Sequence, residues 1–167
     1  MPISMFQASV PVFTHTLGAL AKVLAKGEAN IVERKIDPAV ILSARLAPDM
    51  LSLTKQIQIA TDHAKGAPSR LAGRDSPRFE DTEQTFAELQ ARIAKTVDYL
   101  ATFAAADIDG SEDRAIQLKS PTRERNFTGL HYLQHFALPN FYFHVTTAYD
   151  ILRHNGVPLS KTDFLGA

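Results

Sequence analysis

The 167-residue sequence predicts an all-α fold, a four-helix bundle with a short crossover helix and a small β-hairpin between its third and fourth helices. Three observations lead to this prediction. Apolar residues recur at steps of three and four over four long segments, and turn residues separate those segments. Between the third and fourth of these segments, residues 112–136 do not show the helical period. Because the length fits one domain with a sizeable core, we expect a single domain over residues 1–167.

The first predicted helix follows Ser4, a residue type that caps helix N-termini. Its apolar stripe consists of Phe6, Val10, Phe13, Leu17, Leu20 and Leu24. Pro11 lies inside this segment and should kink it, and Gly27 should end it. After this helix, Asp37 and the proline that follows it predict a cap and a first turn for the short crossover helix over residues 38–44.

The second and third predicted helices both show a clear inner face. The second begins at Pro48, and glycine and proline residues between 66 and 73 end or bend it. Its inner face is predicted to contain Met50, Leu53, Ile57, Ala60 and Ala64. The third helix is capped by Asp81 or Thr82 and ends before the turn at residues 109–110. Its inner face is predicted to contain Phe86, Leu89, Ile93, Val97, Leu100 and either Phe103 or Ala104.

The remaining segment predicts a hairpin and a last helix. Residues 115–118 indicate a short strand, and residues 127–136 indicate a second one. A two-stranded hairpin is marginally stable alone, so we expect it to pack against the helices. Pro139 starts the fourth helix, which should run to about Asn155 and stop at the Gly-Val-Pro sequence that follows.

The composition argues against several classes of function. The 18 basic and 18 acidic residues give a formal net charge of zero, whereas a nucleic-acid partner usually requires a basic face. The sequence has no cysteine, which removes disulfides, thiolate metal sites and cysteine nucleophiles. It also has no G-x-S-x-G, P-loop or G-x-G-x-x-G motif. With neither a secretory signal nor an apolar run long enough for a membrane span, we expect a cytoplasmic protein without a membrane partner.

Two histidine patterns bear on function. His131 and His135 are four residues apart, but on the predicted strand they would lie about 13 Å from each other, at about 3.3 Å per residue. We therefore interpret them as ordinary polar residues and not as a shared metal site. On the fourth helix, Asn140, His144 and Thr147 belong to one stripe beside the inward face. A histidine at that margin must satisfy its ring nitrogens, either with a structural partner or with a metal.

Several segments carry a resemblance to a known family. Residues 45–50, 138–144, 148–157 and 161–166 resemble an uncharacterised bacterial family of domains of unknown function. That family is in turn similar to the DinB/YfiT-like superfamily of metalloenzymes, whose members are four-helix bundles. The resemblance covers nearly the whole chain and implies the same fold.

The resemblance also implies where a site would lie. The superfamily's usual site is a histidine triad, with one histidine from the second helix and two from an H-x-x-x-H sequence on the last helix. His63 matches the first of these positions and His144 the last. Asn140 stands where the middle histidine belongs, so the triad is degenerate in this chain.

Three interpretations of function remain open. In the first, a DinB-like bundle keeps a small-molecule pocket beside the fourth helix, formed by Asn140, His144 and Thr147, with weak or no metal. In the second, the protein is a non-catalytic dimeric structural or interaction protein. In the third, it is a metal-dependent enzyme that binds Zn, Ni or Fe through His63, His144 and an unidentified ligand. We expect a homodimer, because aromatic residues point to several sides of the fourth helix and the neutral charge does not oppose association. The alternative is that residues 112–136 alone cover these aromatic side chains.

Overall fold

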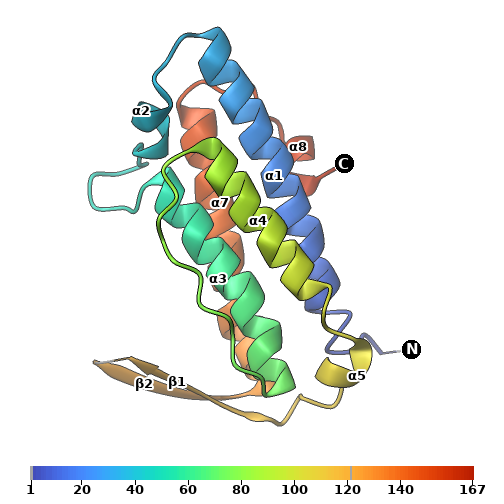
Figure 1. The fold of residues 1–167 in the computed structure, drawn as a ribbon. Coiled ribbons are helices and arrows are strands. Elements are labelled where there is room, and N and C mark those ends of the chain that lie inside the picture. Colours follow the sequence, from blue (N-terminus) through green and yellow to red (C-terminus); the bar gives the residue numbers. More distant parts are fainter. Residues whose placement is uncertain (1, 121) are drawn as a thin grey trace.

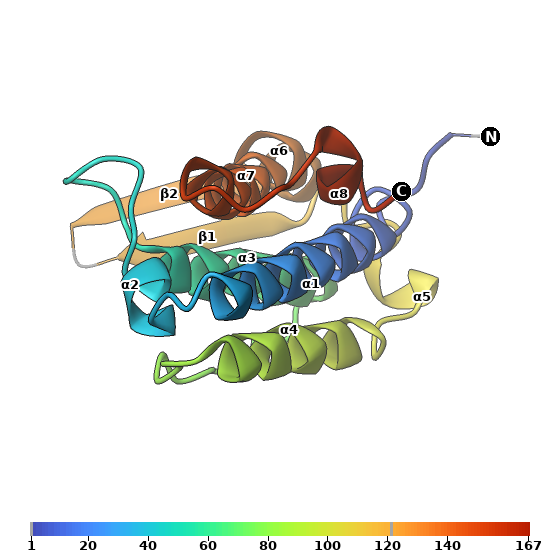
Figure 2. The same cartoon turned by 90° about the horizontal axis from the view of Figure 1, so that it is seen from above.

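The computed structural model describes residues 2–120 and 122–167. The chain is mostly helical, with a two-stranded antiparallel hairpin late in the sequence, as predicted (Figure 1). The long helices are α1 (Val10–Glu33), α3 (Leu53–Ala72), α4 (Phe86–Leu100) and α7 (Leu138–His154). They pack side by side in the cyclic order α1, α4, α3, α7, and α3 makes its most extensive contact with α7 (Figure 2). None of the helices formed by the described residues combines the length and apolar character that crossing a membrane requires.

Shorter elements connect and flank the long helices. They are α2 (Pro38–Leu42), α5 (Ala105–Ile108), β1 (Ala115–Ser120), β2 (Arg123–Thr128), α6 (Gly129–Tyr132), the π-helical turn η1 (Leu133–Ala137) and α8 (Lys161–Leu165). The crossover helix α2 begins as predicted, because the carboxylate of Asp37 accepts a hydrogen bond of 3.0 Å from the backbone amide of Ala39.

The core lies between the four long helices. Phe13 of α1 and Phe141 of α7 meet edge to face there, with ring centroids 4.9 Å apart. Of the inner face predicted for the third helix, Val97 is only partly buried, and the other positions in α4 are fully buried. The buried side chains of the long helices include Leu17, Leu24, Leu53, Ile57, Leu89, Ile93, Leu100, Ala148 and Leu152.

Both predicted ends of the first helix are wrong. Helix α1 begins at Val10, so Pro11 lies in its first turn, where its missing amide hydrogen costs no helical bond and no kink follows. The helix also continues past Gly27 to Glu33. Gly27 serves helix packing instead, because a Cβ atom there would lie 3.0 Å from the Cδ2 atom of Leu152 on α7.

The predicted start of the second helix is wrong as well. Helix α3 begins at Leu53 and not at Pro48, and Met50 is partly exposed to solvent and does not belong to the inner face. Pro68 stays inside the helix, which ends where Gly73 adopts a left-handed conformation with φ of 67°. The predicted inner-face residues from position 53 onward are buried.

Helix α4 begins after Thr85, so the caps predicted at Asp81 and Thr82 are wrong. The hydroxyl of Thr85 accepts a hydrogen bond of 3.2 Å from the backbone amide of Glu88, whose carboxylate accepts one of 3.0 Å from the amide of Thr85. Asp81 is instead part of the loop over residues 73–85, where it pairs with a buried arginine, Arg92.

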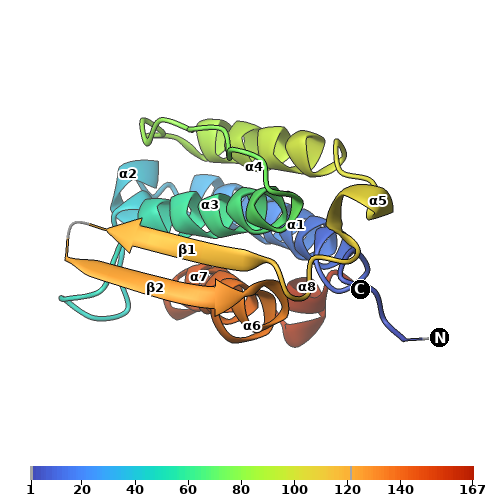
Figure 3. The same cartoon turned by 90° about the horizontal axis from the view of Figure 1, so that it is seen from below.

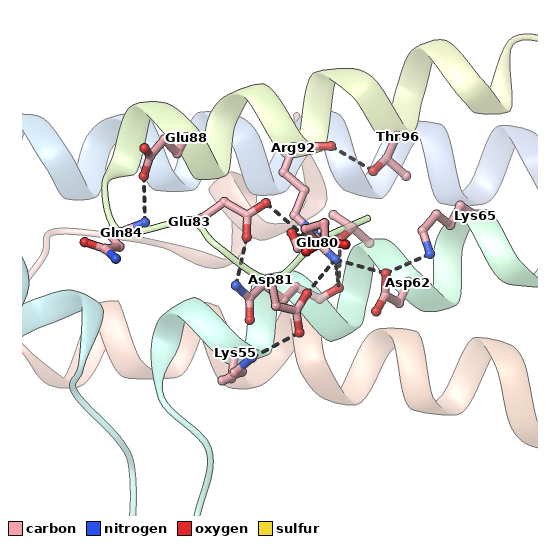
Figure 4. Close-up of polar contacts among 12 residues, drawn as sticks. Lys55, Asp62, Lys65, Glu80, Asp81, Glu83, Gln84, Glu88, Arg92 and Thr96 are labelled. Atoms are coloured by element: carbon pink, nitrogen blue, oxygen red, sulfur yellow. Dashed lines mark hydrogen bonds and ion pairs between the residues drawn. The ribbon is translucent and has the colours of Figure 1, made fainter. Parts of the chain in front are cut away.

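Arg92 fastens this loop to the long helices (Figure 4). Its side chain is only 2% exposed, and its guanidinium lies 3.0, 3.1 and 3.0 Å from the carboxylates of Asp62, Asp81 and Glu83. Its Nε atom also donates a hydrogen bond of 2.7 Å to the hydroxyl of Thr61. Since Asp62 belongs to α3 and the other carboxylates to the loop, one cation from α4 joins three segments of the chain.

The second strand was predicted in the wrong place, because β2 spans Arg123–Thr128 and shares only residues 127–128 with the predicted range 127–136. Strand β2 ends at Thr128, and residues 129–137 form α6 and η1, which lead directly into α7 (Figure 3). Gly129 allows this turn away from the sheet, because a Cβ atom there would lie 1.9 Å from the backbone oxygen of Ser111. The aromatic residues in this segment, which favoured a strand in the sequence analysis, lie on helical turns and pack against one another. Tyr132 and Phe136, for example, have ring centroids 5.9 Å apart.

Candidate functional site

His63 and His144 meet where α3 contacts α7. The centroids of their rings are 5.8 Å apart, and the ring planes differ by 16°. The ring of Phe136, from η1, lies against His63 with a centroid separation of 6.0 Å. The contact between these two helices therefore brings together the two histidines that the family resemblance matched, and an aromatic residue covers one of them.

Hydrogen bonds determine the tautomer of His144. The side-chain amide of Gln56, a buried residue of α3, donates a hydrogen bond of 3.0 Å to the backbone oxygen of Leu51. Its Oε1 atom lies 2.7 Å from Nδ1 of His144. Because this oxygen can only accept, Nδ1 of His144 carries the proton in that bond. Nε2 of His144 is then unprotonated in the neutral ring and presents a lone pair.

Both histidines favour the neutral form. Burial lowers the pKa of His63 to about 4, and the neighbouring charges of His144 and Arg70 act in the same direction. Burial also lowers the pKa of His144. At neutral pH the site therefore holds two uncharged imidazoles, which can accept protons or hydrogen bonds.

We expect the stability of the protein to decrease when the pH falls from about 6.5 toward about 4. The unfolded chain protonates this imidazole near its ordinary pKa of about 6.5, whereas folded His63 does so only near about 4. Between these values the unfolded state binds more protons, so stability that is fully present above about pH 6.5 is lost as the pH falls. Histidine NMR should report the low pKa, and denaturation of His63→Gln should show a weaker acid dependence. A His63 ring that titrates above about pH 6 would contradict the assignment.

The other two predicted binding residues lie differently. Thr147 is buried, and its hydroxyl donates a hydrogen bond of 2.7 Å to the backbone oxygen of Phe143 in its own helix. It lines neither of the cavities beside the histidines. Asn140 is partly buried, and its side-chain nitrogen donates a hydrogen bond of 2.6 Å to the backbone oxygen of Phe136. Its Oδ1 atom remains available as an acceptor.

Two adjoining cavities lie between the hairpin and the helices. The inner cavity, of about 140 Å³, is lined by Asp62, His63, Arg70, Leu118, Tyr132 and Phe136. The outer cavity, of about 320 Å³, is lined by Leu118, Lys119, Ser120, Arg123, Arg125, Phe136 and Asn140. Leu118 and Phe136 line both, so they form a shared apolar wall. We call the two cavities together the hairpin cleft. The hairpin lies over α3 and α7 (Figure 3).

Sequence reasoning missed most residues of the hairpin cleft. Tyr132 lies on α6, and its hydroxyl accepts a hydrogen bond of 3.1 Å from Arg70 of α3. Arg125 projects from β2, and its guanidinium carbon lies 5.2 Å from the centroid of the Phe136 ring. No motif marks these residues. The available signal was the alternation of basic and acidic residues at Arg123, Glu124 and Arg125, and its use depends on knowing which strand face meets the helices.

A larger cavity, of about 380 Å³, lies away from the histidines, between α4 and the loop over residues 73–85. Its walls include Phe79, whose ring lies within cation–π distance of Lys65, Arg92 and Lys95. Arg92 is already engaged with three carboxylates. This region therefore serves to hold the loop, and the hairpin cleft is the better candidate site.

The metal-binding side chains around and including His63 and His144 do not fit a catalytic metal. A catalytic zinc usually has three good protein ligands, at about 2.0–2.1 Å for each imidazole nitrogen. Here Asn140 takes the place of the middle histidine of the triad, and Gln56 is occupied by its bonds to His144 and Leu51. Within residues 2–120 and 122–167, no group of three or more His, Cys, Asp or Glu residues could hold a metal ion.

The placement of His131 and His135 corrects the sequence analysis. Both lie on helical turns, in α6 and η1, and their ring centroids are 4.5 Å apart, compared with the distance of about 13 Å expected on a strand. Both side chains are exposed, and they lie outside the hairpin cleft. Two adjacent surface imidazoles can retain metal ions, so metal measurements on this protein need a control for them.

Comparison with known proteins gives a consistent result over the whole chain. The model of a family described as a domain of unknown function, DUF1993, matches residues 5–165. Among solved structures, the chain is similar to the crystal structure of a DinB family member protein from Shewanella denitrificans. The sequences are 41% identical, the TM-score is 0.89, and the match covers 97% of this chain and 92% of that chain. No curated protein matches the sequence.

Proposed function

The chain belongs to the DUF1993 family, and from that premise we propose that it is a single-domain, DinB-type four-helix bundle that binds a small molecule in the hairpin cleft. The observation that carries this proposal is the pair of neutral imidazoles, His63 and His144, beside a cavity with an apolar wall. Burying two titratable rings without charged partners costs stability, and sites that do so are often functional.

The cleft offers complementary contacts to a bound molecule. Its wall of Leu118 and Phe136 suits an apolar group. Asn140 lines the outer cavity, and its Oδ1 atom is an acceptor for a ligand hydroxyl or amide, since its Nδ2 atom already donates to the backbone oxygen of Phe136. His144 lines neither cavity and supports the site through its stacking on His63. Among the described residues, no hydrogen bond engages the ring of His63, which leaves its nitrogens for a ligand.

Screening small organic compounds by histidine NMR tests this function. We expect binding compounds to shift the ring resonance of His63, which lines the cleft, and to a smaller extent that of His144, whose ring lines neither cavity but stacks on His63. The resonances of His15 and His154, which are exposed on other parts of the helices, should stay in place. A screen at millimolar concentrations in which no compound shifts His63 or His144 would rule out the pocket.

A matched pair of variants tests whether the compounds bind in the hairpin cleft. Phe136→Leu removes an aromatic wall of the cleft and should weaken binding about three- to tenfold. Phe164→Leu changes a similarly part-buried aromatic residue that packs on Tyr149, away from the cleft. Equal losses in the two variants would place the binding site elsewhere.

The proposal includes no bound metal, in contrast to the metal-dependent alternative with His63 and His144 as ligands. Elemental analysis of untagged protein tests this part. The variant that carries His131→Gln and His135→Gln serves as the control for the adjacent surface imidazoles. Zinc, nickel or iron at one ion per chain in that variant would overturn the metal-free proposal.

We also propose that the protein forms a homodimer. Phe143 and Tyr142 of α7 are 56% and 38% exposed, and Leu130 of α6 is exposed near the start of the same helical segment. Large apolar side chains that remain exposed often belong to an interface between subunits. Light scattering over a concentration series should give twice the chain mass of 18.4 kDa. Phe143→Ser should shift the protein toward the monomer, and a mass near 18.4 kDa at every concentration would contradict the dimer.

A further inference from the structure

The hairpin turns two arginines toward the helices. In the antiparallel pairing, Leu118 lies opposite Arg125 and Ser120 lies opposite Arg123. Directly opposite residues share one face of a hairpin, and every second residue along a strand returns to that face. Arg123 and Arg125 therefore share the face of Ile116, which is buried against the helices. Arg125 is partly buried and Arg123 is exposed, and both line the outer cavity.

The positive charge on this face is not neutralised within the protein. Among the residues that the structure describes, no ion pair involves Arg123 or Arg125. The nearest acidic residue in the hairpin, Glu124, belongs to the opposite face, where it accepts a hydrogen bond from Gln117. Asp62, in the inner cavity, already pairs with Lys65 and Arg92. The outer cavity has no acidic residue in its lining.

The two arginines stand at the edge of a cavity of suitable size. The outer cavity, of about 320 Å³, lies within the range that small-molecule sites occupy. The guanidinium of Arg125 rests on the Phe136 ring, 5.2 Å from its centroid, which limits the positions that this cation can take. Phe136 also contacts His63, so one aromatic ring separates the cationic part of the cleft from the histidines.

We infer that the ligand of the hairpin cleft is a small organic anion whose carboxylate, sulfonate or phosphate group is bound by Arg123 and Arg125. This inference rests on the proposed function and adds the chemical class of the ligand. The planar guanidinium groups form paired hydrogen bonds with the oxygens of such anions. The uncharged part of the ligand lies on Phe136, whose ring lines both cavities and contacts His63. A polyanion such as nucleic acid is a poor fit, because the basic surface consists of one hairpin on a protein with zero formal net charge.

Benzyl phosphate, benzoate and benzyl alcohol test the inference, because they share an aromatic ring and differ in charge. Calorimetry should show at least about tenfold tighter binding of benzyl phosphate than of benzyl alcohol, and the difference should decrease at high salt. Histidine NMR should show that benzyl phosphate and benzyl alcohol each shift the ring resonance of His63. The variant with Arg123→Gln and Arg125→Gln should lose most of the preference for the anions and keep its binding of benzyl alcohol.

The control variant is Arg153→Gln, which removes one cation about 20 Å along α7 from Asn140. It should bind all three compounds as the parent protein does. The anion site is wrong if benzyl phosphate binds no more tightly than benzyl alcohol, or if the hairpin variant and the control lose the same affinity. In those cases, a shift of the His63 resonance by benzyl alcohol would still support the proposed small-molecule pocket. If none of the compounds shifts His63 or His144, the pocket and the anion site both fail.

Discussion

Replacement of Arg92 with methionine is expected to lower the free energy of unfolding by about 3 kcal/mol. The methionine keeps most of the buried volume but leaves Asp62, Asp81 and Glu83 without their common cation. Removal of one partner from a buried ion pair costs about 3–5 kcal/mol, and we expect the lower end because Asp62 and Asp81 retain 43% and 41% exposure. Urea denaturation followed by circular dichroism measures the change.

Arg78→Met is the matched control for Arg92→Met. Arg78 lies in the same loop, but its side chain is 90% exposed and only reaches Glu80 at 3.9 Å. Surface substitutions of this kind change stability by no more than about 0.5 kcal/mol. Comparable losses in the two variants would mean that the Arg92 network (Figure 4) does not stabilise the fold.

Truncation of the core face of α4 should have an effect of similar size. Leu100 is fully buried and Ile93 almost fully buried, so Leu100→Ala and Ile93→Ala should each cost about 2–5 kcal/mol. The cost combines the lost transfer energy of the removed methyl groups with that of the cavity left behind. Chemical denaturation measures both variants.

Exposed histidines provide the comparison for these core changes. His154→Ala should change stability by no more than about 0.5 kcal/mol, because its side chain is exposed at the end of α7. His15 is exposed as well, although its Nε2 atom lies 2.9 Å from the backbone oxygen of Leu165, so a somewhat larger effect there is consistent with the structure. Losses at His154 equal to those at Leu100 would mean that the helix faces have been assigned wrongly.

The same local patterns that identified these core faces failed at several helix ends. A glycine or proline marks where a helix can stop, but its neighbours in space decide whether it does. Helix α1 continues through Gly27, where the side chain of Leu152 lies close to the glycine. Gly129 follows the last residue of β2, where the chain passes close to the backbone of Ser111. Asp81 looked like a cap but is the partner of Arg92. In each case, the deciding atom lies on a distant part of the chain.

The residues of the candidate site were also predicted only in part from the sequence. The family resemblance matched His63 and His144 to a triad, and the geometry adds Gln56, whose hydrogen bond leaves a lone pair on Nε2 of His144. Thr147 was grouped with these residues by helical spacing, yet its hydroxyl bonds to its own helix. The spacing of a stripe specifies a direction around a helix and does not specify which neighbouring element the stripe meets.

The sequence by itself determined the features that depend on short-range periodicity and steric preference. These are the mostly helical chain, the buried face of α4, the Asp37 cap and the end of the last helix near Asn155. Only the tertiary structure decided where β2 ends and which helices adjoin. Those two outcomes place His131 beside His135, place His63 beside His144, and turn Arg125 onto Phe136. They depend on packing between residues far apart in the chain, and local sequence patterns carry no information about such contacts.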